Sequence, residues 1–473
     1  MTEPDIAYGE LTFQDSHPGQ IAAVATLLGF TPPPVNTARV LELGCGTGFN
    51  ILAMSQALPN ARFTGIDYSP VQIERALASA SAVGATNIAF LCESILDFAA
   101  EPASFDYIIA HGVYSWISGE TRDALMAIIE RCLSPNGVAY ISYNTYPGWR
   151  SRIVARDVLT FFAQPGATPE ERVRLGREGA ARLIPAITNP ESLYGQTLQA
   201  EVAPLLNAPD YYLAHEYLVE NNFPTYFQDF TAHAARFNLQ YLAESRLLAN
   251  SFVLGSDLRK ALDENAGPDI LRREQYLDFL IGCYFRQSLL CHAGVPINRD
   301  IEAERILPLS VSLTAEILDV QPDAWRIRSH IGAEFTVDDK PIVKILELLR
   351  QHGSAPVPTH VFMQPIIDAL GMHAVAALGG TIIAGILLAG WSRGLWILRA
   401  DTPAVVNAAS AKPIACPLAR LQSQRTTRCT NRPHRTITLT ADEQALLQQL
   451  DGTRDIAPSP ALARLAAEGF LIA

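Results

Sequence analysis

Short apolar runs alternate with segments of helical periodicity along the first 150 residues. The runs that predict strands lie at residues 40–43, 61–66, 88–92, 105–110 and 138–143. Helical spacing between them covers 51–58, 69–82 and 121–133, and Ser69, Pro70 and Gln72 form the expected start of the second of these helices. Five strands that alternate with helices predict a parallel, doubly wound sheet, which binds ligands at the carboxyl ends of its strands.

The composition describes a folded, multidomain protein. At 473 residues, with 49% hydrophobic and 18% charged residues, we expect two to four domains. The net charge of -12 disfavours nucleic acid as the main partner and is compatible with a cationic substrate. Seven cysteines without a C-x-x-C pair indicate neither a disulfide framework nor a metal site, so we expect a reducing compartment, the cytoplasm.

Two segments bear on membrane association. Residues 1–10 carry three acids and no apolar core, so they do not read as a signal peptide. Residues 369–392 are long and apolar enough to cross a bilayer, but they contain five glycines and have no matching second span. We therefore predict a buried helix there and no membrane partner, with a membrane helix as the alternative.

The turn after the first strand carries the candidate chemistry. It reads E-L-G-C-G-T-G, with Gly44, Cys45, Gly46 and Gly48 before a helix start, where backbone N–H groups can face a ligand. Asp67 ends the second strand, placed to accept ribose hydroxyls. The spacing is G-x-G-x-G rather than G-x-G-x-x-G, so no glycine is set aside for a pyrophosphate. This favours a nucleoside with an amino-acid tail, S-adenosylmethionine, over a nicotinamide dinucleotide or a purely structural turn.

Several further motifs carry a resemblance to a known family. They are AHGVYSW (110–116), SYNTYPGW (142–149), YYLAHEYL (211–218), FNLQYLAES (237–245), YLDFL (276–280) and FRQSLLCH (285–292). Together with the glycine turn and Asp67, they resemble class I methyltransferases of a bacterial group with a methyltransferase regulatory domain. The best-understood members of that group are lysine methyltransferases acting on outer-membrane proteins. The likeness covers most of the chain and is most specific in residues 1–300.

The expected fold is a doubly wound, Rossmann-like class I methyltransferase sheet with a helical middle domain and a C-terminal winged-helix-like α+β region. Residues 1–150 form the cofactor-binding core, and 151–300 a helical middle or regulatory region. In it, 151–225 is either an insertion over the active site or a separate domain, and 227–256 re-enters the sheet. Residues 301–400 form a winged-helix-like domain. Residues 401–473 hold a basic linker, expected to be solvated or partner-binding, and a second, small winged-helix-like module.

The candidate site residues follow the strands at their carboxyl ends. The resemblance implies cofactor contacts at Tyr68, Ser94 and Ile95 beside the glycine turn and Asp67, although Ser94 replaces the family's usual acid. We expect Tyr143, Tyr114 and Asn144 to contact the acceptor nitrogen and His111 to act as a base or an adenosine contact. Trp116, Tyr146 and Trp149 supply aromatic walls for a cationic substrate. No metal is expected.

The chemistry and the resemblance predict a methyl transfer from S-adenosylmethionine to an amine, leaving S-adenosylhomocysteine. The resemblance implies a protein lysine as the acceptor and a protein substrate as the partner, with a homodimer possible. A small-molecule methyltransferase is the second hypothesis. The third is a non-catalytic, cofactor-binding regulator that acts through its C-terminal modules.

Overall fold

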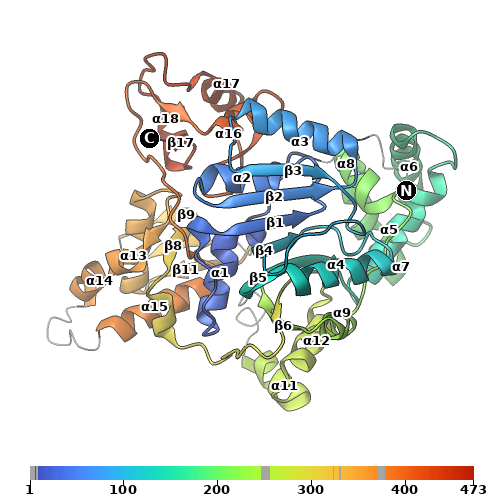
Figure 1. Cartoon of the computed structure of the whole chain (residues 1–473), viewed down its shortest axis with the longest axis horizontal. Helices are drawn as coiled ribbons and strands as arrows, with labels where there is room; N and C mark the ends of the chain where they lie inside the picture. The colour runs from blue at the N-terminus through green and yellow to red at the C-terminus, as the bar shows by residue number, and fades with distance from the viewer. Residues whose placement is uncertain are drawn as a thin grey trace.

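The computed structural model describes residues 6, 9–246, 256–322, 324–329, 332–370 and 379–472. Its central element is a seven-stranded sheet with the strand order β3-β2-β1-β4-β5-β7-β6 (Figure 1). Strands β1 to β5 pair in parallel, whereas β7 runs antiparallel between β5 and β6. The strands are β1 (Arg39–Leu43), β2 (Arg62–Asp67), β3 (Ile88–Cys92), β4 (Phe105–Ala110), β5 (Leu133–Asn144), β6 (Leu239–Glu244) and β7 (Phe285–His292). The predicted doubly wound sheet is confirmed.

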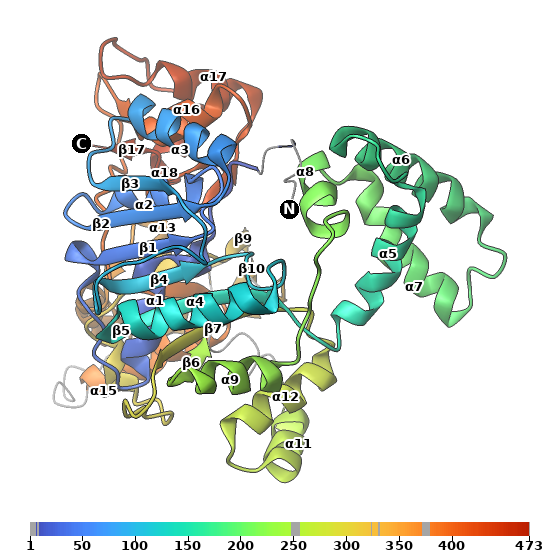
Figure 2. The ribbon, with the colours of Figure 1, turned by 45° about the vertical axis from the view of Figure 1, so that its right-hand side comes forward.

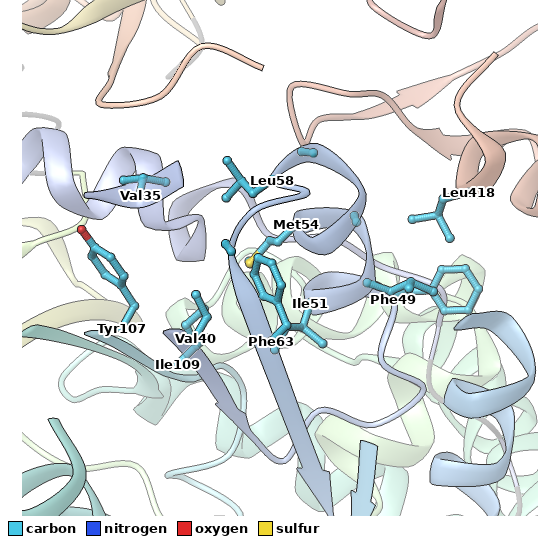
Figure 3. Close-up of a cluster of buried hydrophobic side chains, with 14 of the residues drawn as sticks. Val35, Val40, Phe49, Ile51, Met54, Leu58, Phe63, Tyr107, Ile109 and Leu418 are labelled. Atoms are coloured by element: carbon cyan, nitrogen blue, oxygen red, sulfur yellow. The ribbon is translucent and has the colours of Figure 1, made fainter. Parts of the chain in front are cut away.

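Alternating side chains give the sheet two apolar faces. Val40 and Phe63 belong to a core shared with helices α1 (Pro18–Leu27), α2 (Phe49–Ala57) and α3 (Pro70–Ala82). Leu41 and Ile108 face the other way, into a core with α4 (Gly119–Cys132) and α9 (Phe227–Arg236). Figure 3 shows Met54 of α2 beside Phe63. Burial on both faces explains why β1, β2, β4 and β5 read as nearly continuous apolar runs, whereas only Phe90 is buried in the edge strand β3.

A helical insertion leaves the sheet after β5 and returns before α9. Its elements are α5 (Trp149–Phe162), α6 (Pro169–Leu183), α7 (Leu193–Val202), α8 (Asp210–Tyr212) and the π-helical turn η5 (Leu213–Tyr217). It has a core of its own, which includes Leu159, Val173 and Leu213. Figure 2 shows α5, α6 and α7 standing apart from the sheet, with α8 nearest to it. Helices α11 (Ser256–Ala266) and α12 (Ile270–Ile281) then connect β6 to β7.

The next unit surrounds a separate core that includes Leu346, Phe362 and Trp396. Short strands β8 (Ser310–Leu313), β12 (Val357–Pro358) and β13 (Trp396–Arg399) pair in the order β12-β8-β13, beside helices α13 (Lys340–Gln351), α14 (Met363–Leu370) and α15 (Gly379–Ser392). Strands β9 (Glu316–Val320), β10 (Trp325–Arg328) and β11 (Glu334–Val337) form a second sheet. Part of the apolar stretch at 369–392, residues 371–378, lies outside the described residues. No helix among those described is long and apolar enough to span a bilayer.

The basic segment at 399–435, expected to be a solvated or partner-binding linker, has no regular secondary structure at 402–413 but forms two short strands and a helix within 414–430. Arg399 is fully buried, pairs with Asp401 at 2.8 Å and donates to the Pro433 carbonyl at 2.7 Å. Leu418 packs into the core around α2 (Figure 3). The arginine-rich pattern misled us because a guanidinium group can satisfy buried carbonyls and acids as well as solvent. The module comprises β14 (Ile414–Ala415), α16 (Pro417–Ser423), β15 (Arg428–Thr430), β16 (Thr436–Thr438), α17 (Ala441–Gln449), α18 (Pro460–Ala467) and β17 (Leu471–Ile472).

Candidate active site

A cavity of about 910 Å³ lies at the carboxyl ends of β1 to β4. Residues from the glycine turn, the insertion and the N-terminal segment 9–13 line it together. Small-molecule sites commonly measure about 300–1,000 Å³. The cavity is therefore large enough for a nucleoside cofactor together with an acceptor side chain.

The three glycines of the turn share a backbone conformation that favours glycine. Each has a left-handed backbone, with φ of 70° at Gly44, 53° at Gly46 and 73° at Gly48. A Cβ on Gly48 would lie 2.6 Å from the Phe90 ring, whereas one on Gly46 would meet nothing within 4 Å. Gly48 thus permits close packing and does not line the cavity. Gly46 leaves cavity space next to its backbone for a ligand to approach.

Asp67 joins the glycine turn to the end of β2. Its carboxylate accepts hydrogen bonds from the Gly46 N–H at 2.9 Å and the Ser69 N–H at 3.0 Å. The side chain lines the cavity, as the ribose contact requires. Asp67 therefore holds the turn in shape in addition to the ribose role that the sequence predicts for it.

Glu42 is a cavity residue that the sequence reasoning missed, although it stands inside the glycine motif. It is 3% exposed, and its Oε1 accepts a hydrogen bond from Asn50 Nδ2 at 2.6 Å. Within the described chain, its Oε2 is buried with no hydrogen-bond partner. Burial, aided by the charge of Asp67, raises the pKa of Glu42 to about 7 against the opposing Asn50 hydrogen bond. The ammonium group of a bound methionine moiety would supply the missing partner.

Asn50 connects this site to both ends of the chain. Its Oδ1 accepts hydrogen bonds from the Phe13 N–H at 2.9 Å and from His434 Nε2 at 3.0 Å. Phe13 belongs to the segment over the cavity, and His434 to the C-terminal module. One side chain therefore fixes Glu42, the N-terminal segment and the C-terminal module against one another.

The remaining cofactor candidates also lie at the cavity. Cys45, Tyr68, Ser94 and Ile95 line it, and Tyr68 is 50% exposed. The Ser94 hydroxyl accepts a hydrogen bond from the Leu96 N–H at 3.2 Å. Its contact with adenine stays a prediction.

His111 forms part of the cavity wall. Its ring stacks on Phe13 with centroids 3.5 Å apart, and its Nδ1 lies 2.9 Å from the Tyr140 hydroxyl. Gln287 Nε2 donates to that hydroxyl at 2.9 Å and to Asp15 Oδ2 at 3.1 Å. Burial lowers the pKa of His111 to about 3, so the ring is neutral and a weak proton acceptor at pH 7.

The other three acceptor candidates do not line the cavity. The Tyr143 ring stacks on Phe230 of α9 at 4.1 Å, with its hydroxyl 3.1 Å from Ser288 Oγ. The Tyr114 hydroxyl lies 2.8 Å from His233 Nδ1 on the same helix. Asn144 is 4% exposed and donates its backbone N–H to Ser115 Oγ at 2.8 Å. Tyr143 and Tyr114 belong to the core on the α4 and α9 side of the sheet, which turns them away from the cavity.

Of the three aromatic residues expected to form walls for the substrate, one lines the cavity and two do not. Trp116 lines the cavity. Trp149 is 2% exposed and packs edge-on against Trp116 at 6.4 Å, so it supports the wall from behind. Tyr146 packs on Tyr226 at 5.3 Å outside the lining.

The insertion contributes polar residues that helical spacing did not identify. His215 and Glu220 share no face of an α-helix, yet both line the cavity beside Glu216. His215 and Glu216 belong to the π-helical turn η5, whereas Glu220 lies in the bend that follows it. Arg172 of α6 also lines the cavity. Nowhere in the described ranges do three or more His, Cys, Asp or Glu side chains gather as metal ligands.

The strand order of the sheet and the glycine turn after β1 are those of a class I methyltransferase. Family models match a methyltransferase domain over residues 40–137, a predicted methyltransferase regulatory domain over 209–292 and a PKMT C-terminal winged helix domain over 411–469. The chain belongs to the S-adenosylmethionine-dependent methyltransferases that carry this regulatory domain, as its motifs predicted.

Three relatives from Rickettsia illustrate the relationship. One uncharacterised protein of Rickettsia prowazekii is 35% identical over 65% of this chain, which spans 55% of that protein. A second is 33% identical over 49% of this chain, which spans 93% of it. The structure of PKMT2 from Rickettsia typhi in complex with AdoHcy is 25% identical, with a TM-score of 0.85 over 98% of this chain and 100% of that one. The expected fold, including a C-terminal winged helix, is thus confirmed.

Proposed function

We propose that this protein transfers the methyl group of S-adenosylmethionine to the amine of lysine side chains in proteins. One observation carries the proposal. The described lining of the cavity holds five carboxylates, Glu42, Asp67, Glu93, Glu216 and Glu220, against one guanidinium, Arg172. Such a surface favours cationic ligands, both a sulfonium cofactor and an ammonium substrate. The similarity to PKMT2, a protein lysine methyltransferase by its name, supports a protein as the acceptor.

The side chains of the cavity divide the work between cofactor and acceptor. When bound, S-adenosylmethionine supplies an electrophilic methyl group on a positively charged sulfur. Glu42 and Asp67, which line the cavity, would hold its ammonium and ribose groups, and Gly46 would allow its close approach. Phe13, His111 and Trp116 offer aromatic faces, which exclude water and tolerate positive charge. Since methyl transfer is an in-line displacement, this positioning is the main contribution of the protein.

We also propose a cytoplasmic location and a basic protein segment as the partner. The seven cysteines are free thiols, which supports a reducing compartment, the cytoplasm. The net charge of -12 favours a basic protein segment over nucleic acid as the partner.

Labelled methyl transfer tests this function. The full chain would be incubated with S-adenosylmethionine carrying a tritiated methyl group and a heat-denatured fraction of bacterial envelope proteins. Acid hydrolysis should then release methyllysine as the labelled amino acid. Gly46→Leu, whose side chain would occupy the ligand space, is the inactive control.

Other outcomes identify the rival functions. Label that appears only in small molecules of a cell extract would support the small-molecule methyltransferase. Absence of transfer to proteins and extract alike, from a protein that binds S-adenosylhomocysteine in calorimetry, would support the non-catalytic regulator.

A further inference from the structure

Glu216 lines the cavity from the π-helical turn η5. Its neighbours Leu213, Ala214 and Tyr217 are buried in the core of the insertion, which fixes the turn. The described residues provide its carboxylate with neither a hydrogen bond nor an ion pair, and Arg152 of α5 acts on it only electrostatically. The cavity thus contains a carboxylate positioned by packing and available to a ligand. Single-turn π-helices occur frequently at functional sites.

The charged surroundings of Glu216 come from several elements. The groups nearby on the insertion are Arg152 of α5, Arg172 of α6, Tyr212 of α8, His215 and Tyr217 of η5 and, after it, Glu220. Arg172 is engaged by the Leu218 carbonyl, to which it donates at 3.0 Å. Across the cavity stand Glu42, Asp67, Tyr68, Glu93 and His111. Burial raises the pKa of Glu216 to about 7, against the lowering effect of Arg152.

A lysine methyltransferase needs a proton acceptor in this cavity. Lysine has an unperturbed pKa of about 10.4, so almost all of it is ammonium at pH 7.5 and cannot attack. Among the candidates, His111 has a pKa of about 3, and Glu42 is bonded to Asn50 beside the glycine turn. Tyr143 and Tyr114 lie outside the lining. Two carboxylates, Glu216 and Glu220, lie on the insertion side across from the cofactor loop, and of these Glu220 is exposed whereas Glu216 is half-buried.

We propose that Glu216 binds the ammonium group of the acceptor lysine and removes its proton. This rests on the proposed function and names the residue that makes the amine reactive. The carboxylate takes one proton and becomes a carboxylic acid, which leaves a neutral amine. The nitrogen lone pair then forms the N–C bond as the C–S bond breaks, and its electron pair goes to sulfur. The products are the thioether S-adenosylhomocysteine and a methylammonium ion.

The pH dependence of kcat/KM tests Glu216 directly. In the wild type, kcat/KM for the labelled protein fraction should rise to about pH 7 and then stay level, because ionised Glu216 accepts the ammonium proton. In Glu216→Gln only neutral lysine can react, so kcat/KM should climb about tenfold per pH unit toward the lysine pKa. At pH 7.5 the loss should be about 100-fold or more.

A matched substitution on the same insertion controls for charge and stability. Glu178→Gln changes an exposed residue of α6, which pairs with Arg174 at 3.1 Å away from the cavity lining. It should retain the wild-type rate and profile. Both variants should bind S-adenosylhomocysteine as the wild type does, since neither touches the glycine turn.

Several results would overturn the assignment without affecting the proposed function. One is a wild type that methylates proteins while Glu216→Gln matches its rate and its level profile. Another is loss of S-adenosylhomocysteine binding in Glu216→Gln, which would give the residue a cofactor or folding role. If the wild type transfers no methyl group at all, the proposed function fails. Whether Glu216 binds an ammonium group is then tested with n-butylamine. This amine should raise the melting temperature of the S-adenosylhomocysteine complex in the wild type and not in Glu216→Gln.

Discussion

Cofactor affinity should depend on pH through Glu42. The carboxyl is 3% exposed, has a pKa of about 7 in the empty protein and has one oxygen without a partner in the described chain. The ammonium group of the ligand binds the ionised form of Glu42, so a proton on the carboxyl competes with the ligand. Affinity is then reduced by the factor 1 + 10^(pKa - pH), which is about 11 at pH 6.0 and about 1.3 at pH 7.5. We expect S-adenosylhomocysteine to bind about eightfold more weakly at pH 6.0, about 1.3 kcal/mol.

Calorimetric titration at the two pH values measures this ratio. Glu42→Gln has no ionisable group at this position, so its weaker affinity should be nearly independent of pH. Glu216→Gln is the matched control, because it removes the other cavity carboxyl with a pKa of about 7 on the acceptor side, and it should keep the eightfold ratio. A wild type with equal affinity at both pH values, or a Glu42→Gln variant that retains the ratio, would refute this reasoning.

Three further predictions concern the residues around the site and the sheet edge. Gly44→Ala should weaken S-adenosylhomocysteine binding at least tenfold in calorimetry, because φ is 70° and the new Cβ would lie 2.6 Å from Val113. Asn50→Ala removes the hydrogen bond that lowers the pKa of Glu42, so the pH at which cofactor affinity falls should move above 7 in the same titrations. Arg286→Met should cost about 3–5 kcal/mol in urea unfolding at pH 7.5, because three buried carboxylates lose their partner. The cost should shrink at pH 5.5, because burial raises the pKa of Glu274 and raises the pKa of Asp278 to about 6, so the charge that Arg286 compensates falls.

The parallel half of the sheet and its cofactor loop could be predicted because their signals are local. Strands buried on both faces read as apolar runs, and the glycine spacing limits the ligand. Strand β7 was not assigned, although its sequence was noted as a family motif. It begins with Phe285-Arg286-Gln287-Ser288, and its polar residues bind other parts of the chain, such as Gln287 to Tyr140. A local pattern does not reveal such a strand, which pairs antiparallel between two neighbours.

The acceptor side was harder to predict for a different reason. Tyr143 lies at the carboxyl end of the fifth strand and Trp149 follows it, but the direction of each side chain depends on packing against Phe230 and Trp116. Glu216 was not among the predicted site residues, because its segment, 211–218, was noted only as a family motif. The sequence contains no simple signal for a π-helical turn, so the face that η5 presents to the cavity became visible only in the structure.

The hydrogen bond between His434 and Asn50 spans 384 positions along the chain. During synthesis, the sheet strands β1 to β5 and the glycine turn emerge from the ribosome long before the residue that completes the surroundings of Asn50. The growing chain therefore carries an unfinished cofactor pocket through most of its translation. Assembly of this pocket requires the C-terminal module, so cofactor binding reports on the folding of that module.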